Sequence, residues 1–290
     1  MRLLSHDLDG RGDRLAVAVS EHEAVDVGEL LGDGPWTMGQ LLADVEHSLQ
    51  RVRHALAAAP GGPARPIADL RLLGPVPRPS KIVAVGRNYR EHAAEEEAVL
   101  PEAPLLFAKL PSALVGHDAD VTWSTELTGQ VDYEAELAVV IGRRARSVPA
   151  EVALEHVLGY TCLNDVSARD LQVADGQWTR AKGLDTFCPM GPWLVTADEI
   201  PDPGALRVRC RVNGDVRQDA TTAQLVHGVA ELVAYCSTSF ALEPGDIIAT
   251  GTPGGVGAFR DPPLFLADGD VVEVEIGGIG ILRNRCRAVA

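Results

Sequence analysis

Apolar residues occur in short runs along most of the chain, and these runs end at turn residues or at a change of polarity. The segments 81–86, 104–109 and 131–142 are rich in Val, Ile, Leu and Phe. Such composition over five to twelve residues is typical of β-strands. The pattern therefore predicts several strands in the middle of the chain.

Two further segments alternate apolar and polar residues around a turn signal. Residues 207–218 contain Asn213-Gly214, a pair that strongly favours a tight hairpin, and residues 271–285 pass through Gly277-Gly278. Helical patterns are fewer and lie at about 149–157 and 223–240. Many short strands and few helices predict a β-rich α+β fold, with closed or sandwiched sheets.

Residues 1–75 differ from the rest of the chain. They contain a short strand pattern at 15–19, a helical pattern at 38–59 and a Gly/Pro-rich link at 60–66. We find no chemistry-bearing pattern in this region, which suits a packing or lid domain. We predict a small N-terminal α/β domain over residues 1–75 and a larger domain over residues 76–290.

Composition narrows the class of protein. The chain has 290 residues, 46% of them hydrophobic, and a net charge of -15. This acidity argues against binding nucleic acid, and it suits either a cation partner or simple solubility. The five cysteines lack CxxC spacing, as expected of reduced thiols in a cytoplasmic protein. We see neither a signal-peptide pattern nor the roughly 18 apolar residues of a membrane helix.

Two glutamates stand two residues apart in the predicted strand at 131–142. Side chains at this spacing share one face of a strand, so the Glu134 and Glu136 carboxylates should repel each other. A divalent cation between them would remove the repulsion, since Mg²⁺ prefers oxygen ligands. Asp165, where an apolar run meets a polar turn, is the candidate third ligand. The alternative is an ordinary solvated strand face.

Six segments between Lys81 and Gly257 together resemble the fumarylacetoacetate hydrolase family. In chain order they are VGRNYREHAAE, DYEAELAVVIG, GYTCLNDVSARDLQ, WTRAKGLDTFCPMGP, RVNGDVRQ and LEPGDIIATGTPGGVG. The chain is similar to two-domain members such as 2-hydroxyhepta-2,4-diene-1,7-dioate isomerase and acylpyruvate hydrolases. The resemblance implies a mixed β-roll catalytic domain, a Mg²⁺ or Mn²⁺ ion held by Glu134, Glu136 and Asp165, and a homodimer formed through the catalytic domains.

The same resemblance supplies candidate catalytic residues. His92 and Glu95 are three residues apart among good helix formers, so they can share a helix face. A carboxylate beside an imidazole makes it a better base, which suits activation of water or movement of a proton on carbon. Lys182 matches the family's lysine at the metal site, where an ammonium stabilises enolate charge. The acidic segment 91–104 is the expected lid over the substrate.

Five further residues are candidates for substrate contact. Arg169 can hold a substrate carboxylate, or else it forms a structural ion pair, for instance with Asp170 or Asp185. The glycines of TGTPGGVG lack the phosphate-loop pattern, and we expect their amides to approach a substrate carboxylate. The candidate substrate-binding residues are Arg87, Asn88, Arg169, Gln172 and Thr252.

The resemblance implies a metal-dependent hydrolase that cleaves a C–C bond in an acylpyruvate or related β-diketo acid through an enolate. A decarboxylase or isomerase of oxaloacetate or a 2-oxo or 2-hydroxy dienedioate would use the same site. A third alternative is a silent relative that binds ligands or serves in an assembly, but the complete set of metal-binding and catalytic candidates argues against it. The expected partner is therefore a small 2-oxo acid.

Overall fold

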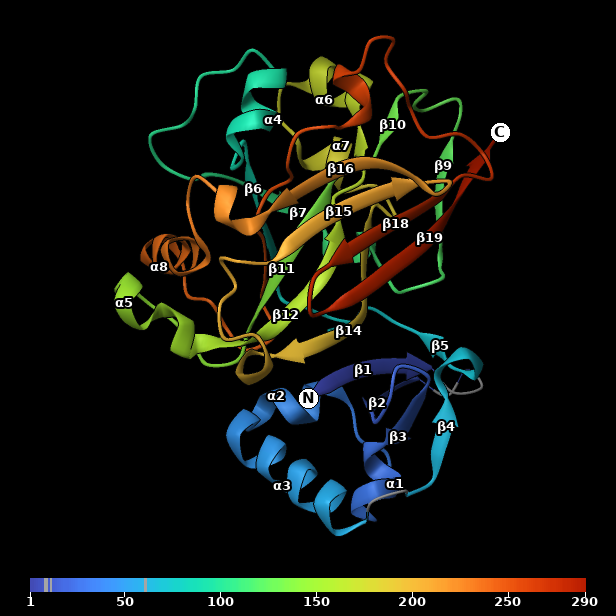
Figure 1. Ribbon diagram of the computed structural model, residues 1–290, viewed down its shortest axis with the longest axis vertical. Coiled ribbons are helices and arrows are strands. Elements are labelled where there is room, and N and C mark those ends of the chain that lie inside the picture. The colour runs from blue at the N-terminus through green and yellow to red at the C-terminus, as the bar shows by residue number, and fades with distance from the viewer. Residues whose placement is uncertain (8–9, 11, 60–61) are drawn as a thin grey trace.

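A computed structural model describes residues 1–7, 10, 12–59 and 62–290, and mixed β-sheets dominate it (Figure 1). The largest sheet has the order β4-β3-β2-β1-β14-β12-β11-β17-β6-β7, with β5 beside β1 and β8 beside β14. A second sheet has the order β16-β15-β18-β19-β9, and β10 pairs with β13. The predicted β-rich α+β class is confirmed.

The bounds of the elements follow in chain order. The strands are β1 Arg2–Asp7, β2 Asp13–Ala18, β3 Glu23–Asp26, β4 Ala64–Pro66, β5 Arg71–Leu72, β6 Ile82–Gly86, β7 Leu105–Lys109, β8 Leu114–Val115, β9 Asp120–Ser124, β10 Val131–Asp132, β11 Ala135–Ile141, β12 Val157–Asn164, β13 Ser167–Ala168, β14 Cys188–Thr196, β15 Arg207–Val212, β16 Asp215–Thr221, β17 Ile247–Ala249, β18 Val271–Ile276 and β19 Gly280–Val289. The α-helices are α1 Val27–Leu31, α2 Met38–Ala43, α3 Val45–Ala58, α4 Arg90–Glu95, α5 Ala150–Ala153, α6 Arg169–Asp175, α7 Thr179–Lys182 and α8 Val229–Ser239.

The predicted hairpins are present, and the predicted helices differ in their bounds. Asn213 and Gly214 have φ of 53° and 85°, as the type I′ turn between β15 and β16 requires. The helix predicted at 38–59 is two helices, because the Asp44 side chain caps α3 by accepting from the His47 amide. Helix α8 starts six residues later than predicted, since Leu225 forms a β-bridge with Tyr89.

The N-terminal region extends the large sheet. Strand β1 pairs with β14 through Arg2 opposite Val195 and Leu3 opposite Leu194. Figure 1 shows α1, α2 and α3 gathered beside β1–β4 at the lower end of the molecule. One β-sheet runs through both regions. The domain boundary at residue 75 therefore stays a prediction.

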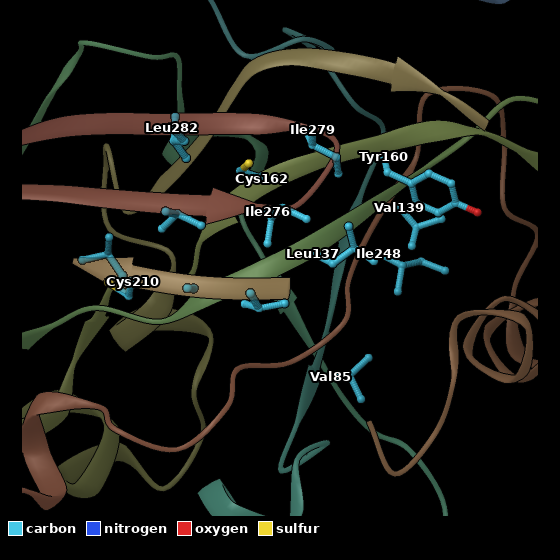
Figure 2. Close-up of a cluster of buried hydrophobic side chains, with 14 of the residues drawn as sticks. Val85, Leu137, Val139, Tyr160, Cys162, Cys210, Ile248, Ile276, Ile279 and Leu282 are labelled. Atoms are coloured by element: carbon cyan, nitrogen blue, oxygen red, sulfur yellow. The ribbon is translucent and has the colours of Figure 1, made fainter. Parts of the chain in front are cut away.

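Strand β11 lies at the centre of the core, and every residue of it is buried. Leu137 and Val139 pack into one apolar cluster, where Val139 stands opposite Ile248 of β17 (Figure 2). Ala138 and Val140 point to the other face and a second cluster. Strand β11 is therefore fixed on both faces, which makes it a rigid support for the glutamates at its start.

The five cysteines are free and buried, in agreement with the prediction of reduced thiols. Among the described residues, no helix combines the length and the apolar character needed to span a bilayer.

A buried aspartate ties the N-terminal strands to α1 and makes stability there depend on pH. The Asp26 carboxylate caps α1, accepts from Arg14 at 2.8 Å and lies 3.5 Å from the His6 ring. Burial opposes its charge, but these partners lower the pKa of Asp26 from 3.8 to about 2. The folded state thus favours the carboxylate, and this stabilisation is present above pH 4 and declines as the pH falls toward 2.

We expect Asp26→Asn, which keeps a capping side chain, to lower the free energy of unfolding at pH 7 by roughly 2 kcal/mol. At pH 3 the difference from wild type should shrink to about half. Urea unfolding of both proteins at the two pH values measures it. An equal difference at both values would contradict a role for the charge.

Candidate active site

The three predicted metal ligands converge at the start of β11. Glu134 directly precedes the strand, Glu136 lies within it, and Asp165 directly follows the neighbouring strand β12. All three side chains are buried, and each offers a carboxylate oxygen within 4.8 Å of the others'. The antiparallel pairing of Ala135 with Asn164 brings Asp165 beside the glutamates.

The charges around these carboxylates are unequal. Glu134 lies 2.8 Å from Lys182 Nζ and 2.7 Å from Arg169 Nη1, and despite burial these cations lower the pKa of Glu134. Glu136 accepts from the Gly251 amide, and among the described residues it forms no ion pair. Burial and the charges of Asp165 and Glu134 raise the pKa of Glu136 well above its usual range.

This charge pattern fits a divalent cation. Three buried carboxylates supply the all-oxygen donor set that Mg²⁺ and Mn²⁺ prefer, and Glu136 lacks the positive charge that a metal ion would bring. Glu134, Glu136 and Asp165 would hold the ion.

Lysines complete the buried cluster, and sequence analysis identified only one of them. Lys182 Nζ donates to Glu134, Asp165 and Ser167, each at 2.8 Å. Burial opposes its charge, but Asp165 and Glu134 raise the pKa of Lys182. Lys109, at the end of β7, is buried with its Nζ 2.5 Å from Asp165 Oδ1. The sequence offered one signal for Lys109, which is its place at the end of an apolar strand. An ammonium buried there needs an anionic partner.

His92 projects from α4, and its ring lies between two carboxylates. Nδ1 is 3.7 Å from Glu95, the predicted partner, and Nε2 is 3.2 Å from Glu96. The Glu95 carboxylate also accepts from the Gly255 amide at 2.7 Å. Burial works against the imidazolium, but Glu95 and Glu96, with Glu134 nearby, raise the pKa of His92 to about 9. His92 is therefore an acid at neutral pH in the absence of other ligands.

Three of the predicted substrate residues line a cavity beside this cluster. Arg87 donates to Glu96 at 2.7 Å, and Gln172 accepts from Arg169 at 3.0 Å. The Thr252 hydroxyl donates to the Ala135 carbonyl. Arg87 and Gln172 thus keep polar atoms for a ligand, whereas Thr252 helps to fix β11.

Asn88 and Arg169, the other two predicted substrate residues, bond to other parts of the chain. The Asn88 side chain bonds to the backbone of His227 and Thr250, so it holds chain segments together. Arg169 is buried and pairs with Asp132 at 2.9 Å and with Glu134 at 2.7 Å. The ion pair considered as its alternative therefore exists, but with these partners in place of Asp170 and Asp185.

Two amides of the glycine-rich loop, which we expect to approach a substrate carboxylate, have partners within the site. The amide of Gly251 donates to Glu136 and that of Gly255 donates to Glu95, so these amides orient carboxylates of the site itself. The cavity that remains has a volume of about 10 Å³, enough for one water molecule. Phe107 and Trp178 form its apolar wall.

Comparisons with known proteins agree with this geometry. Residues 81–287 match the family model described as fumarylacetoacetate (FAA) hydrolase C-terminal. A mitochondrial oxaloacetate tautomerase of Bos taurus is 46% identical over 253 residues, which cover 87% of this chain and 80% of that protein.

Two solved structures cover all of this chain and are covered by it fully. One is a 5-carboxymethyl-2-hydroxymuconate delta-isomerase from Mycobacterium smegmatis, with 38% identity and a TM-score of 0.78. The other is a maleylpyruvate hydrolase from Sphingobium sp. SYK-6 in complex with manganese(II) and pyruvate, with 35% identity and a TM-score of 0.82. Tautomerase, isomerase and hydrolase activities thus occur among proteins similar to this chain.

Proposed function

Because the chain belongs to the fumarylacetoacetate hydrolase family, we propose that it is a divalent-metal-dependent enzyme that interconverts the enol and keto forms of a small 2-oxo acid. Oxaloacetate is the proposed substrate, and the 46% identity to an oxaloacetate tautomerase supports this choice. The observation that carries the proposal is the position of the His92 ring, between Glu95 and Glu96 and on the cavity that the carboxylate cluster also lines.

The residues of the site suit proton transfer on carbon. In the enol-to-keto direction the C2 hydroxyl releases a proton to solvent and C3 gains one from the site, and the site then regains a proton from solvent. The His92 ring lines the cavity between two carboxylates, which favour its imidazolium form, and as an imidazolium it can deliver a proton to C3. Lys182 keeps a buried ammonium where negative charge develops on the C2 oxygen. Bound Mg²⁺ or Mn²⁺ would add Lewis-acid stabilisation of the same charge.

Hydrolysis of a C–C bond in an acylpyruvate is the second candidate. The similarity to a maleylpyruvate hydrolase and the preference from sequence analysis both favour it. Hydrolysis needs His92 as a neutral base and room for an attacking water, whereas the raised pKa of His92 in the chain without metal favours its acid form. Decarboxylation of oxaloacetate would use the same shell of residues. The homodimer implied by the family stays a prediction.

A turnover panel separates these reactions. We expect the protein with Mg²⁺ to accelerate loss of the enol absorbance of oxaloacetate without releasing pyruvate, and EDTA to remove the effect. Lactate dehydrogenase coupled to the assay detects pyruvate, and re-addition of Mg²⁺ controls for damage by EDTA. An acetylpyruvate, a fumarylpyruvate and a 2-hydroxy-dienedioate complete the panel. Pyruvate from an acylpyruvate would assign hydrolysis, pyruvate from oxaloacetate would assign decarboxylation, and no metal-dependent turnover would contradict the proposal.

A further inference from the structure

Glu96 is a carboxylate of the cavity to which the proposed chemistry assigns no role beyond its contact with His92. It follows α4 directly, and its side chain is only 10% exposed. Oε2 accepts from Arg87 Nε at 2.7 Å, and Oε1 lies 3.2 Å from His92 Nε2. Glu95 already provides a carboxylate on the other side of the ring, so Glu96 is a second one.

The contacts of Glu96 are those that a bound acid would seek. Arg87 and His92 both line the cavity, and Glu96 pairs with each of them. An arginine and an imidazolium give a carboxylate charge-assisted hydrogen bonds, which are the strong ones. With Glu96 between them, the cavity retains about 10 Å³, so a substrate larger than water enters only if a side chain moves.

Glu96 is better placed to move than the other acids of the cavity. Glu134 and Glu136 are fixed by β11 and its neighbours, whereas Glu96 lies at the end of a six-residue helix. The next residue, Glu97, has a φ of 50°, a left-handed conformation that side chains rarely adopt. Helix α4 therefore ends at a sharp change of backbone direction directly after Glu96.

Arg87 has a support that does not depend on Glu96. Its guanidinium lies 5.8 Å from the centre of the Trp178 ring, a cation–π arrangement. Gly86 makes room for this ring, since a Cβ there would lie 2.5 Å from Trp178 Cζ3. Arg87 can thus stay in place while one carboxylate replaces another.

We propose that the Glu96 carboxylate occupies the subsite of the substrate's second carboxylate, and that a 2-oxo diacid enters by displacing it from Arg87 and His92. This inference rests on the proposed function. A diacid replaces each charge-assisted hydrogen bond that Glu96 gives up. A 2-oxo monoacid leaves the half-buried Arg87 and Nε2 of the buried His92 ring without this carboxylate once Glu96 moves aside, and this costs binding energy. The exchange selects diacids.

The test compares two acids that differ only in the second carboxylate. Malate and 2-hydroxybutanoate share four carbons and a 2-hydroxy acid group, and titration calorimetry measures their binding to the Mn²⁺-loaded protein. We expect wild type to prefer malate and Glu96→Gln to bind malate about 10-fold more tightly, with 2-hydroxybutanoate changed much less. Arg87→Gln should abolish the preference. Glu97→Gln, which removes the same charge at an exposed neighbour, should behave as wild type.

The outcomes distinguish the two proposals. An unchanged or weakened affinity of Glu96→Gln for malate overturns the proposed role of Glu96. If the protein still turns over oxaloacetate, the proposed function is unaffected by that result. Equal affinity of wild type for the two acids also overturns it. Failure of all proteins to bind either acid, with no turnover of oxaloacetate, overturns both proposals together.

Discussion

Replacing Glu136 by glutamine should weaken the binding of Mn²⁺ by at least about 100-fold while leaving the fold intact. The Glu136 carboxylate is buried and faces Glu134 and Asp165, and among the described residues no cation pairs with it. A glutamine amide keeps the size and can still accept from the Gly251 amide, but it removes one of three anionic ligands. Titration calorimetry with Mn²⁺ measures the loss.

Stability provides a second readout for Glu136→Gln. Free Mn²⁺ at 100 times its Kd raises the free energy of unfolding of wild type by about 2.7 kcal/mol, and the variant should gain none at that concentration. Without metal, the variant should be at least as stable as wild type, because it removes the burial and the repulsion by Asp165 and Glu134 of a charge, which together raise the pKa of Glu136. Glu126→Gln, at an exposed turn, is the matched control. Equal Mn²⁺ affinities of the two variants would exclude Glu136 as a ligand.

The pH dependence follows from the same pKa. Since the folded chain without metal raises the pKa of the Glu136 carboxyl, Mn²⁺ must displace a proton there, and its affinity should rise with pH. Calorimetry in two buffers of different ionisation enthalpy counts the released proton. Glu136→Gln should lose this proton release.

Sequence analysis singled out the carboxylates from a local spacing, and the family resemblance then favoured a metal site over a solvated strand face. Glu134 and Glu136 show the two-residue period of a strand, and Asp165 ends the neighbouring apolar run. Lys109 was missed because its partner Asp165 is far along the chain and meets it only through the sheet. Glu96 was missed because the His-x-x-Glu spacing favoured Glu95, although residues three and four apart both neighbour a helical side chain.

In the fold as well, features set by neighbouring residues were predictable, and contacts between distant parts of the chain were not. The Asn213-Gly214 hairpin was predicted because a type I′ turn restricts the residues at its two central positions. The pairing of β1 with β14 has no local signature, since it joins Leu3 to Leu194. The break between α2 and α3 could have been predicted from Asp44, whose side chain caps α3. The apolar period continues across residues 38–59 and therefore suggested a single helix.

Replacing His92 by glutamine should lower kcat for the enol-to-keto reaction by about 10²- to 10⁴-fold, the usual contribution of a positioned acid or base. Glutamine can still donate a hydrogen bond toward Glu96, but it cannot carry the proton that the raised pKa of His92 retains at neutral pH. Because His92 is outside the carboxylate cluster, the affinity for Mn²⁺ should stay within a few-fold of wild type. Loss of catalysis with retained metal binding separates proton transfer from metal binding.

The control is His54→Gln, an exposed histidine of α3, which should leave both kcat and Mn²⁺ affinity unchanged. Stopped-flow absorbance of the enol at saturating oxaloacetate measures kcat, and thermal unfolding with Mn²⁺ checks the fold. If His92→Gln kept kcat within about threefold of wild type, Lys182 and the metal ligands alone would account for the reaction. A matching loss in acylpyruvate cleavage would instead place His92 in the hydrolytic reaction, since water attack needs the same ring as its base.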